Sequence, residues 1–398
     1  MRLKRITLAF AIVLLLGVSV PAQTFTTLHN FTGGADGTGP DAGVIQDPAG
    51  DLYGATDVGG NLNCNASSGC GVVFELNTAG TETVLHTFSG NPDGEYPYMP
   101  VARDKAGNIY GTTFSGGSSS CEQNYGCGTV FKIDTAGNET VLHSFTGGSD
   151  SCNPWQGLLV DDAGTLFGTT WGYFCSSTYG TIFKLDSAGK FTTLHHFTGY
   201  PSDGANPRFG HLTMDKCGNL YGVTYWGGAY NGGALYKLST KGKLILLYSF
   251  GSGWDSLNPE GSVVLDEAGN LYGTSSWGGP AQAGTIWKVN RKGKETILHS
   301  FGCGRSDGCY THAGVTRDSK GNLYGVAYWG GANDWGALYK LSACGRLVLL
   351  HSFDFSDGAN PIGEVLRTDK GTLFGTTDEG GTGYCNGWGC GTVWSYVP

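Results

Sequence analysis

The sequence predicts an all-β fold, a seven-bladed β-propeller, from a repeated triplet, its spacing and the composition between its copies. A triplet of Leu or Ile, Tyr or Phe, and Gly begins at Leu52, Ile109, Leu166, Leu220, Leu271, Leu323 and Leu373. Successive copies are 57, 57, 54, 51, 52 and 50 residues apart. Short Val-, Leu-, Tyr- and Thr-rich runs lie between Gly-rich turns, which is typical of strands. Repeats of about 50 residues are typical of propeller blades.

Each copy contains four strand-like segments, which in the fifth copy are 262–266, 270–276, 284–290 and 295–301. An Asp-x-x-Gly turn joins the first segment to the second, and another Gly-ended turn joins the third to the fourth. Glycine supplies the positive φ that such tight turns need. The other two connections are longer. We therefore expect the tight turns at one end of each four-stranded antiparallel blade and the long loops at the other.

The two ends of the chain indicate how the ring closes. A lone fourth-strand segment, 26–31, precedes the first full copy, and the seventh copy ends at its third segment, 391–397. We expect the N-terminal strand to complete the last blade, because unpaired sheet edges are unfavourable. A linear β-solenoid is the main alternative, but its repeats are usually shorter and it requires distinct caps.

The N-terminus has the features of a secretory signal. Arg2, Lys4 and Arg5 precede the apolar run 6–20, which is too short to span a bilayer, and small residues follow near a cleavage site. The sequence thus predicts a signal peptide over 1–22 and a single propeller domain over 23–398. We expect a secreted, periplasmic or cell-envelope protein, monomeric and without a membrane span after signal cleavage.

Composition and motifs exclude several classes of function. The formal net charge of −9 disfavours nucleic acid as a partner, because nucleic acid attracts a basic face. Phosphate-binding, dinucleotide, nucleophile-elbow and zinc-protease motifs are missing from the sequence. We therefore expect no cofactor.

The 12 cysteines predict disulfides in an exported protein. The predicted pairs are Cys64/Cys70, Cys121/Cys127, Cys152/Cys175, Cys303/Cys309 and Cys385/Cys390. Zinc fingers are the alternative, but none of these clusters has its own His partners. Cys217 and Cys344 lie in tight turns two blades apart, farther than the ~7 Å between Cα atoms that a disulfide spans. We expect both thiols to be free or to pair between molecules.

Two sets of repeated polar residues are interpreted as structural. A histidine near the end of the fourth segment recurs at His29, His86, His143, His195, His299 and His351, and Tyr248 takes its place in the remaining copy. These histidines lie on different blades, too far apart to share an ion, so we predict packing residues with one hydrogen bond each. Aspartates recur in the Asp-x-x-Gly turns and in the loop after each histidine. We expect them to accept hydrogen bonds from their own turn backbone.

The repeat G-N-L-Y-G-T-T, followed by G-G, G-T-V-F-K-L and E-T-V-L-H-S-F, resembles the GloVer repeat. This tandem repeat characterises the choice-of-anchor GloVer-containing proteins of bacteria, and the resemblance covers 23–398. It implies an exported bacterial protein for which the family supplies no established activity. The C-terminal anchoring segment that such proteins often carry is not visible in this sequence.

Candidate binding residues lie where the copies differ, at the long-loop end. An aromatic arc on blades 3 to 6 comprises Trp155, Trp171, Tyr225, Trp226, Trp277, Tyr328 and Trp329. Blades 7 and 1 carry acidic residues at Asp41, Asp57, Glu364, Asp378 and Glu379. Arg208 and His312 occupy the position of Asp41 in other copies. Aromatic faces suit sugar rings and carboxylates accept hydroxyl hydrogen bonds, although the aromatics could instead wedge neighbouring blades apart.

The leading functional hypothesis is a binding or scaffold protein that recognises an extracellular glycan or other polymer, and an enzyme is less favoured. The alternative is a polysaccharide hydrolase or lyase, with Asp57, Asp378 and Glu379 as candidate catalytic carboxylates and His211 or His312 as an acid or base. A third possibility is a protein-interaction module of the cell envelope. No metal site is predicted.

Overall fold

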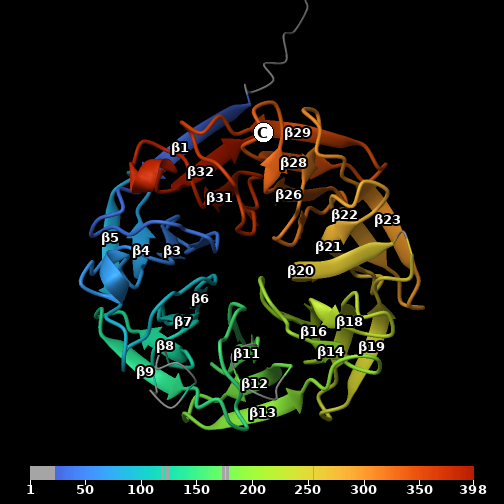
Figure 1. Cartoon of the computed structure of the whole chain (residues 1–398), viewed down its shortest axis with the longest axis horizontal. Helices are drawn as coiled ribbons and strands as arrows, with labels where there is room; N and C mark the ends of the chain where they lie inside the picture. The colour runs from blue at the N-terminus through green and yellow to red at the C-terminus, as the bar shows by residue number, and fades with distance from the viewer. Residues whose placement is uncertain (1–22, 118–120, 122–125, 173–174, 176–178, 254) are drawn as a thin grey trace, which may run out of the picture.

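The computed structural model describes 23–398, apart from 118–120, 122–125, 173–174, 176–178 and 254. The predicted signal peptide, 1–22, lies outside the described residues. Seven four-stranded antiparallel sheets surround a central axis, and the chain visits them in order around the ring (Figure 1). The predicted all-β, seven-bladed propeller is confirmed.

Within each blade the first strand is innermost and the fourth is outermost (Figure 1). Blades 1 and 2 contain β2 (Ile45–Gln46), β3 (Leu52–Thr56), β4 (Val72–Leu76), β5 (Glu82–Thr87), β6 (Ala102–Arg103), β7 (Ile109–Thr113), β8 (Thr129–Ile133) and β9 (Glu139–Ser144). Blades 3 and 4 contain β10 (Leu159–Val160), β11 (Leu166–Thr170), β12 (Thr181–Leu185), β13 (Phe191–His196), β15 (Thr213–Met214), β16 (Leu220–Thr224), β18 (Ala234–Leu238) and β19 (Leu244–Ser249). Blades 5 and 6 contain β20 (Ser256–Leu265), β21 (Leu271–Gly278), β22 (Thr285–Val289), β23 (Glu295–Ser300), β25 (Thr316–Arg317), β26 (Leu323–Ala327), β28 (Ala337–Leu341) and β29 (Leu347–Ser352).

Blade 7 closes the ring as predicted. It contains β30 (Leu366–Arg367), β31 (Leu373–Thr377) and β32 (Thr392–Val397), and its fourth strand is β1 (Thr24–Asn30) from the start of the described chain. The β1–β32 register runs antiparallel from Thr24 opposite Val397 to Asn30 opposite Thr392. Figure 1 shows β1 beside β32 at the junction of the first and last blades. The first and last strands of the described chain therefore pair in one sheet, and this pairing closes the ring between blades 7 and 1.

The inner strands are shorter than the sequence suggested. Most contain two residues, because the chain leaves the sheet as it enters the long-loop end, whereas β20 of blade 5 extends to ten. In blades 4 and 6 the loops form small two-stranded sheets instead, β14 (Gly204–Ala205) with β17 (Trp226–Gly227) and β24 (Gly308–Cys309) with β27 (Trp329–Gly330). These ladders fix the loops on which the candidate binding residues lie.

Close packing explains the Gly of the repeated triplet. In blade 5 a Cβ on Gly273 of β21 would lie 2.5 Å from Cζ2 of Trp287 on β22. Trp287 is fully buried, and its ring atoms occupy the space beside the glycine. Phe, Tyr or Trp from the third strand covers the same glycine in the other blades. Each blade thus places its largest core ring where the second strand has no side chain.

The hydrophobic core lies mainly between adjacent blades. One buried cluster joins Val130 and Phe145 of blade 2 to Leu166 and Phe183 of blade 3, and comparable clusters join other neighbouring blades. Because each blade buries its apolar faces against two neighbours, closure of the ring completes the core.

The turns and disulfides agree with the sequence predictions. In the first Asp-x-x-Gly turn, Asp47 Oδ1 accepts hydrogen bonds from the backbone N–H groups of Ala49, Gly50 and Asp51 at 2.9, 2.9 and 3.0 Å. The five predicted disulfides are Cys64–Cys70, Cys121–Cys127, Cys152–Cys175, Cys303–Cys309 and Cys385–Cys390. Cys217 and Cys344 are unpaired and exposed. Among the described residues, no helix has the length and apolar character needed to cross a membrane.

Candidate functional site

Three tryptophans of the predicted arc are exposed on the long-loop end. Trp226, Trp277 and Trp329 lie at or just beyond the end of the second strand of blades 4, 5 and 6, and they are 43%, 40% and 49% exposed. The antiparallel pairs β14–β17 and β24–β27 fix the first and third, and the long β20–β21 hairpin fixes the second. Large aromatic side chains normally bury most of their area, so these indoles hold apolar surface that the fold leaves available.

The three indoles are connected by tyrosines. The Tyr225 ring is perpendicular to Trp226 with centroids 4.9 Å apart, and the Tyr225 hydroxyl lies near the polar edge of Trp277. Tyr310 then lies 4.9 Å from Trp277 and 5.5 Å from Trp329, edge-on to both. These side chains form one continuous aromatic surface across three blades, which we call the indole arc: Tyr225, Trp226, Trp277, Tyr310 and Trp329.

The remaining predicted aromatics, Trp155, Trp171 and Tyr328, are half-buried and pack against neighbouring rings. Trp155 and Trp171 meet perpendicularly with centroids 4.4 Å apart, and Tyr98 stacks on Trp155 at 5.8 Å. Tyr328 of blade 6 is also half-buried and contacts His312 at 5.3 Å. This group fills the inner ends of the loops between blades. The predicted aromatic arc therefore divides into an inner packing group and the exposed indole arc.

Three of the five predicted acidic residues of blades 7 and 1, Asp41, Asp57 and Asp378, lie together near Gly39. A Cβ on Gly39 would lie 2.2 Å from Asp57 Oδ1 and 3.4 Å from Asp378 Oδ1. Asp41 and Asp378 lie close enough for each carboxyl to change the pKa of the other. Oδ1 of Asp41 and Oδ1 of Asp57 are buried with no hydrogen-bond partner among the described residues. We call Asp41, Asp57 and Asp378 the carboxylate cluster.

Burial and mutual repulsion change the protonation of this cluster. Burial raises the pKa of Asp41 well above its ordinary value, and the charges of Asp378 and Asp57 raise it further. Burial followed by repulsion from Asp378 likewise raises the pKa of Asp57. Both effects favour the protonated form of these carboxyls more than in an ordinary aspartate, and a protonated carboxyl can donate as well as accept a hydrogen bond.

One amide connects the indole arc to the acidic side. With its oxygen toward blade 6, Asn360 accepts a hydrogen bond from Trp329 Nε1 at 2.8 Å, and its nitrogen donates to Glu379 Oε2 at 3.0 Å. Glu379 is half-buried next to Asp378 in the chain, and burial followed by the Asp378 charge raises its pKa. The aromatic and acidic surfaces are therefore joined by hydrogen bonds at the junction of blades 6 and 7.

Arg208 and His312, which the sequence analysis predicted as ligand contacts, both bind the buried carboxylate of Glu260. Glu260 is 1% exposed, and its Oε1 accepts from Arg208 Nε at 2.6 Å and also from Nη2. Its Oε2 lies 2.6 Å from His312 Nδ1. Burial alone would raise the pKa of Glu260, but His312 and Arg208 outweigh it and lower the pKa. The Arg208 guanidinium also lies 3.7 Å above the Tyr225 ring, so this ion pair supports the indole arc from below.

Glu364, predicted with the acidic group, reaches across the channel instead. Its Oε1 accepts from Ser262 N–H at 2.7 Å, and its Oε2 lies 3.3 Å from His211 Nδ1. Ser262 Oγ lies 2.7 Å from the same His211 nitrogen. Because serine and carboxylate approach one nitrogen, the group does not match a Ser-His-acid triad, in which they bind opposite ring nitrogens. Residues of blades 4, 5 and 7 are linked here.

Below this link the channel contains a cavity of about 350 Å³. Its walls are mainly apolar and include Val44, Val101 and Leu158, with His211 and Glu364 at one side. The carboxylate cluster lies on the long-loop side, where Asp41 and Phe209 line a narrow neck.

Sequence reasoning missed Tyr310 and Phe209. Tyr310 occupies the position held by Asn in most other copies, where the amide reaches the preceding blade, as Asn258 Nδ2 does to Tyr225 O at 2.9 Å. The replacement of this Asn by Tyr is the signal that could have identified it. Phe209 follows Arg208 with a positive φ of 56°, a turn that its residue type does not predict.

The family model of the Gloeobacter/Verrucomicrobia repeat matches the chain over 15–171, 117–317 and 266–398. No functionally curated protein matches the sequence.

Solved propellers share the fold at low identity. A streptogramin B lyase is 13% identical with a TM-score of 0.61, covering 94% of this chain and 97% of its own. Virginiamycin B lyase from Staphylococcus aureus is 12% identical with a TM-score of 0.60, covering 94% and 99%. The extracellular domain of a hybrid two-component system from B. thetaiotaomicron is 14% identical with a TM-score of 0.58, covering 94% and 41%. At these identities the likeness concerns the fold alone.

Proposed function

We propose that this chain, which belongs to the Gloeobacter/Verrucomicrobia repeat family, binds an extracellular glycan across the indole arc. The observation that carries the proposal is the contiguous exposure of Trp226, Trp277 and Trp329 on three consecutive blades. Indole faces stack on the C–H faces of sugar rings, and the neighbouring carboxylates and tyrosine hydroxyls accept or donate hydrogen bonds to sugar hydroxyls. An extended polymer suits such a row because successive rings can meet successive indoles.

The expected energy follows from the exposed area. A Trp side chain presents up to ~250 Å², so exposures of 40–49% leave roughly 100–120 Å² on each indole. If a sugar ring covers half of that area, burial contributes about 1.3 kcal/mol per indole at ~25 cal/mol per Å². Each indole then accounts for about a tenfold change in Kd.

Glycan arrays followed by titration calorimetry test the proposal. We expect binding of a polysaccharide or oligosaccharide, weakened about tenfold by each of Trp226→Ala, Trp277→Ala and Trp329→Ala. Trp388→Ala is the matched control, since Trp388 is 58% exposed but belongs to the blade 7 loop outside the arc. Failure to bind any glycan, or equal weakening by Trp388→Ala, would count against glycan binding. Co-purifying envelope proteins without glycan affinity would favour the protein-interaction module instead.

A second candidate is acid–base cleavage of a polysaccharide by the carboxylate cluster. The observation in its favour is the closely spaced group of carboxyls beside Gly39, where burial and mutual repulsion raise the pKa of Asp41 and of Asp57. A glycosidase needs one protonated and one ionised carboxyl, and such a spread of pKa values favours that combination. Reducing-end assays over a panel of polysaccharides would test it, with loss of turnover expected in Asp378→Asn. Inactivity of the unsubstituted protein over the whole panel would reject this candidate and leave the binding proposal intact.

A further inference from the structure

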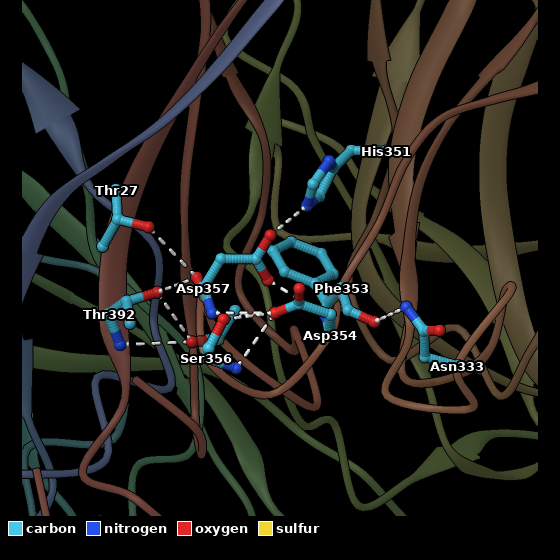
Figure 2. Close-up of polar contacts among 9 residues, drawn as sticks. Thr27, Asn333, His351, Phe353, Asp354, Ser356, Asp357 and Thr392 are labelled. Carbon is cyan, nitrogen blue, oxygen red and sulfur yellow. Dashed lines mark hydrogen bonds and ion pairs between the residues drawn. The ribbon is translucent and has the colours of Figure 1, made fainter. Parts of the chain in front are cut away.

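The outer rim of the propeller repeats a pair formed by a fourth-strand side chain and a loop aspartate. His86 Nε2 lies 3.1 Å from Asp93 Oδ1, and comparable pairs occur in the other blades. Figure 2 shows the blade 6 pair, in which His351 points at Asp357 with 2.7 Å between Nε2 and Oδ2. The other pairs are His29/Asp36, His143/Asp150, His195/Asp203, Tyr248/Asp255 and His299/Asp307. The sequence prediction of one hydrogen bond per histidine holds for five of the six, since His29 Nε2 has no hydrogen-bond partner among the described residues.

A third residue, from the next blade, distinguishes the pairs. This third residue lies on the outermost strand of the next blade, four positions before the rim histidine of that blade (or before Tyr248 in blade 4). Phe191 stacks on His143 with centroids 4.0 Å apart, and Phe25 stacks on His351 at 3.7 Å. Glutamate takes this place in three blades, and Glu295 accepts a hydrogen bond from Tyr248 Oη at 3.2 Å. The remaining two glutamates therefore meet a histidine–aspartate pair.

In one of these places three donor groups converge. Ligand atoms of His86, Asp93 and Glu139 all lie within 4.8 Å of one another. The distances from His86 Nε2 to the two Asp93 oxygens are 3.1 and 3.3 Å. Bonds of ~2.1 Å to a tetrahedral ion would place its ligands about 3.4 Å apart, so these spacings fit a coordination edge. Glu139 Oε1 is buried with no hydrogen-bond partner in the described part of the chain.

The charges of the three side chains suit a divalent cation. Ser89 donates to Asp93 Oδ2 through its backbone N–H at 2.9 Å and its hydroxyl at 3.0 Å, which holds the Asp93 carboxylate in place. A neutral imidazole and two carboxylates carry two negative charges, which one divalent ion balances.

We propose that His86, Asp93 and Glu139 bind a divalent cation of the zinc type at the rim between blades 1 and 2. One imidazole nitrogen and two carboxylate oxygens are a donor set that Zn²⁺ and Co²⁺ accept, with water completing the coordination. The His86 and Asp93 side chains are 19% and 15% exposed, so an ion can reach the cluster from solvent. The bound ion joins the outer strands β5 and β9 and fastens one blade to the next. This assignment departs from the sequence analysis, which predicted no metal site.

The related cluster His29, Asp36 and Glu82 contains the same residue types in a looser arrangement. His29 Nε2 lies 3.8 Å from Asp36 Oδ2. An ion bound at that second cluster would not depend on Glu139. The test therefore compares the number of ions bound by the parent and by each variant, and does not use the total number bound by the parent.

The test uses the oxidised, tag-free chain with Cys217→Ser and Cys344→Ser in every variant, because exposed thiols would compete for zinc. Calorimetry with Zn²⁺ alone, elemental analysis after gel filtration, and Co²⁺ absorption are the measurements. We expect Glu139→Gln to bind one ion fewer than the parent, or to bind it at least ~100-fold more weakly, since one of three ligands is lost. We also expect Zn²⁺ to raise the melting temperature of the parent more than that of Glu139→Gln.

Glu295→Gln is the matched control, because Glu295 occupies the equivalent position but faces Tyr248 instead of histidine. It should bind as many ions as the parent. His86→Gln should lose the same ion, and near-native circular dichroism would show that both variants fold. Identical zinc binding by the parent and Glu139→Gln, or no binding by the parent at micromolar Zn²⁺, would overturn the proposal.

Discussion

Glu260→Ala is expected to destabilise the propeller strongly, because Glu260 is the shared partner of two side chains from other loops. Removing one partner of a buried ion pair costs about 3–5 kcal/mol, since the remaining charge is left uncompensated. Arg208 and His312 are each 21% exposed and so retain some hydration, which places the estimate near the lower limit, about 3 kcal/mol. An unfolding entropy of ~2.1 cal/mol/K per residue over 398 residues converts this to a fall of about 4 °C in melting temperature.

Differential scanning calorimetry at pH 7 with the disulfides intact measures the effect. Glu267→Ala is the control, because Glu267 is exposed in the turn of the same blade and should change stability by less than ~0.5 kcal/mol. Arg208→Met should cost clearly less in the Glu260→Ala background than alone, as expected for coupled partners. If Glu260→Ala melts within a degree of Glu267→Ala, the ion pair does not brace the site as described.

The same carboxylate predicts a pH dependence. The folded pKa of Glu260 lies below its ordinary value, because His312 and Arg208 outweigh the effect of burial. Its stabilising contribution is therefore present above the ordinary carboxyl pKa and is lost as the pH falls through the lowered folded value. The melting-temperature gap between the parent and Glu260→Ala should shrink below about pH 4. A gap that stays constant from pH 7 to pH 3 would contradict this.

Three further predictions test other parts of the structure. Gly273→Ala should destabilise by about 1–3 kcal/mol in chemical denaturation, because its Cβ would lie 2.5 Å from the Trp287 ring; an unchanged midpoint would refute the packing. Asp41→Asn should raise the melting temperature at pH 8 and lose that advantage toward pH 4, since burial and Asp378 raise the folded pKa of Asp41 and its ionisation destabilises the fold; a gain independent of pH would be inconsistent. Thiol titration of the native chain should count two reactive groups, Cys217 and Cys344.

The sequence was sufficient for the frame of the propeller because that frame repeats. A fixed triplet spacing predicted the blades, and the unpaired segment 26–31 predicted the closure by β1. Close cysteine spacing predicted the disulfides for a similar reason, since local pairs need no knowledge of tertiary contacts. Features set by local periodicity were thus accessible from the residues alone.

The site could be predicted only in outline, because its contacts join distant copies. Nothing local indicates that Arg208 and His312 meet at Glu260, or that Glu364 crosses the channel to His211. Exposure likewise depends on neighbours. Trp171 and Trp226 lie one and two residues after the second strand of blades 3 and 4, yet the first packs on Trp155 and the second is exposed.

The central claim is that the indole arc is the binding surface, and indole-selective NMR tests it most directly. The chain has ten tryptophans, and ¹⁵N-labelled indole signals can be assigned by single Trp→Phe substitutions. Addition of a glycan selected on the array should shift the signals of Trp226, Trp277 and Trp329 and leave the buried Trp287 and Trp394 unchanged. Shifts confined to tryptophans outside the arc, with those three signals unmoved at saturation, would contradict the account.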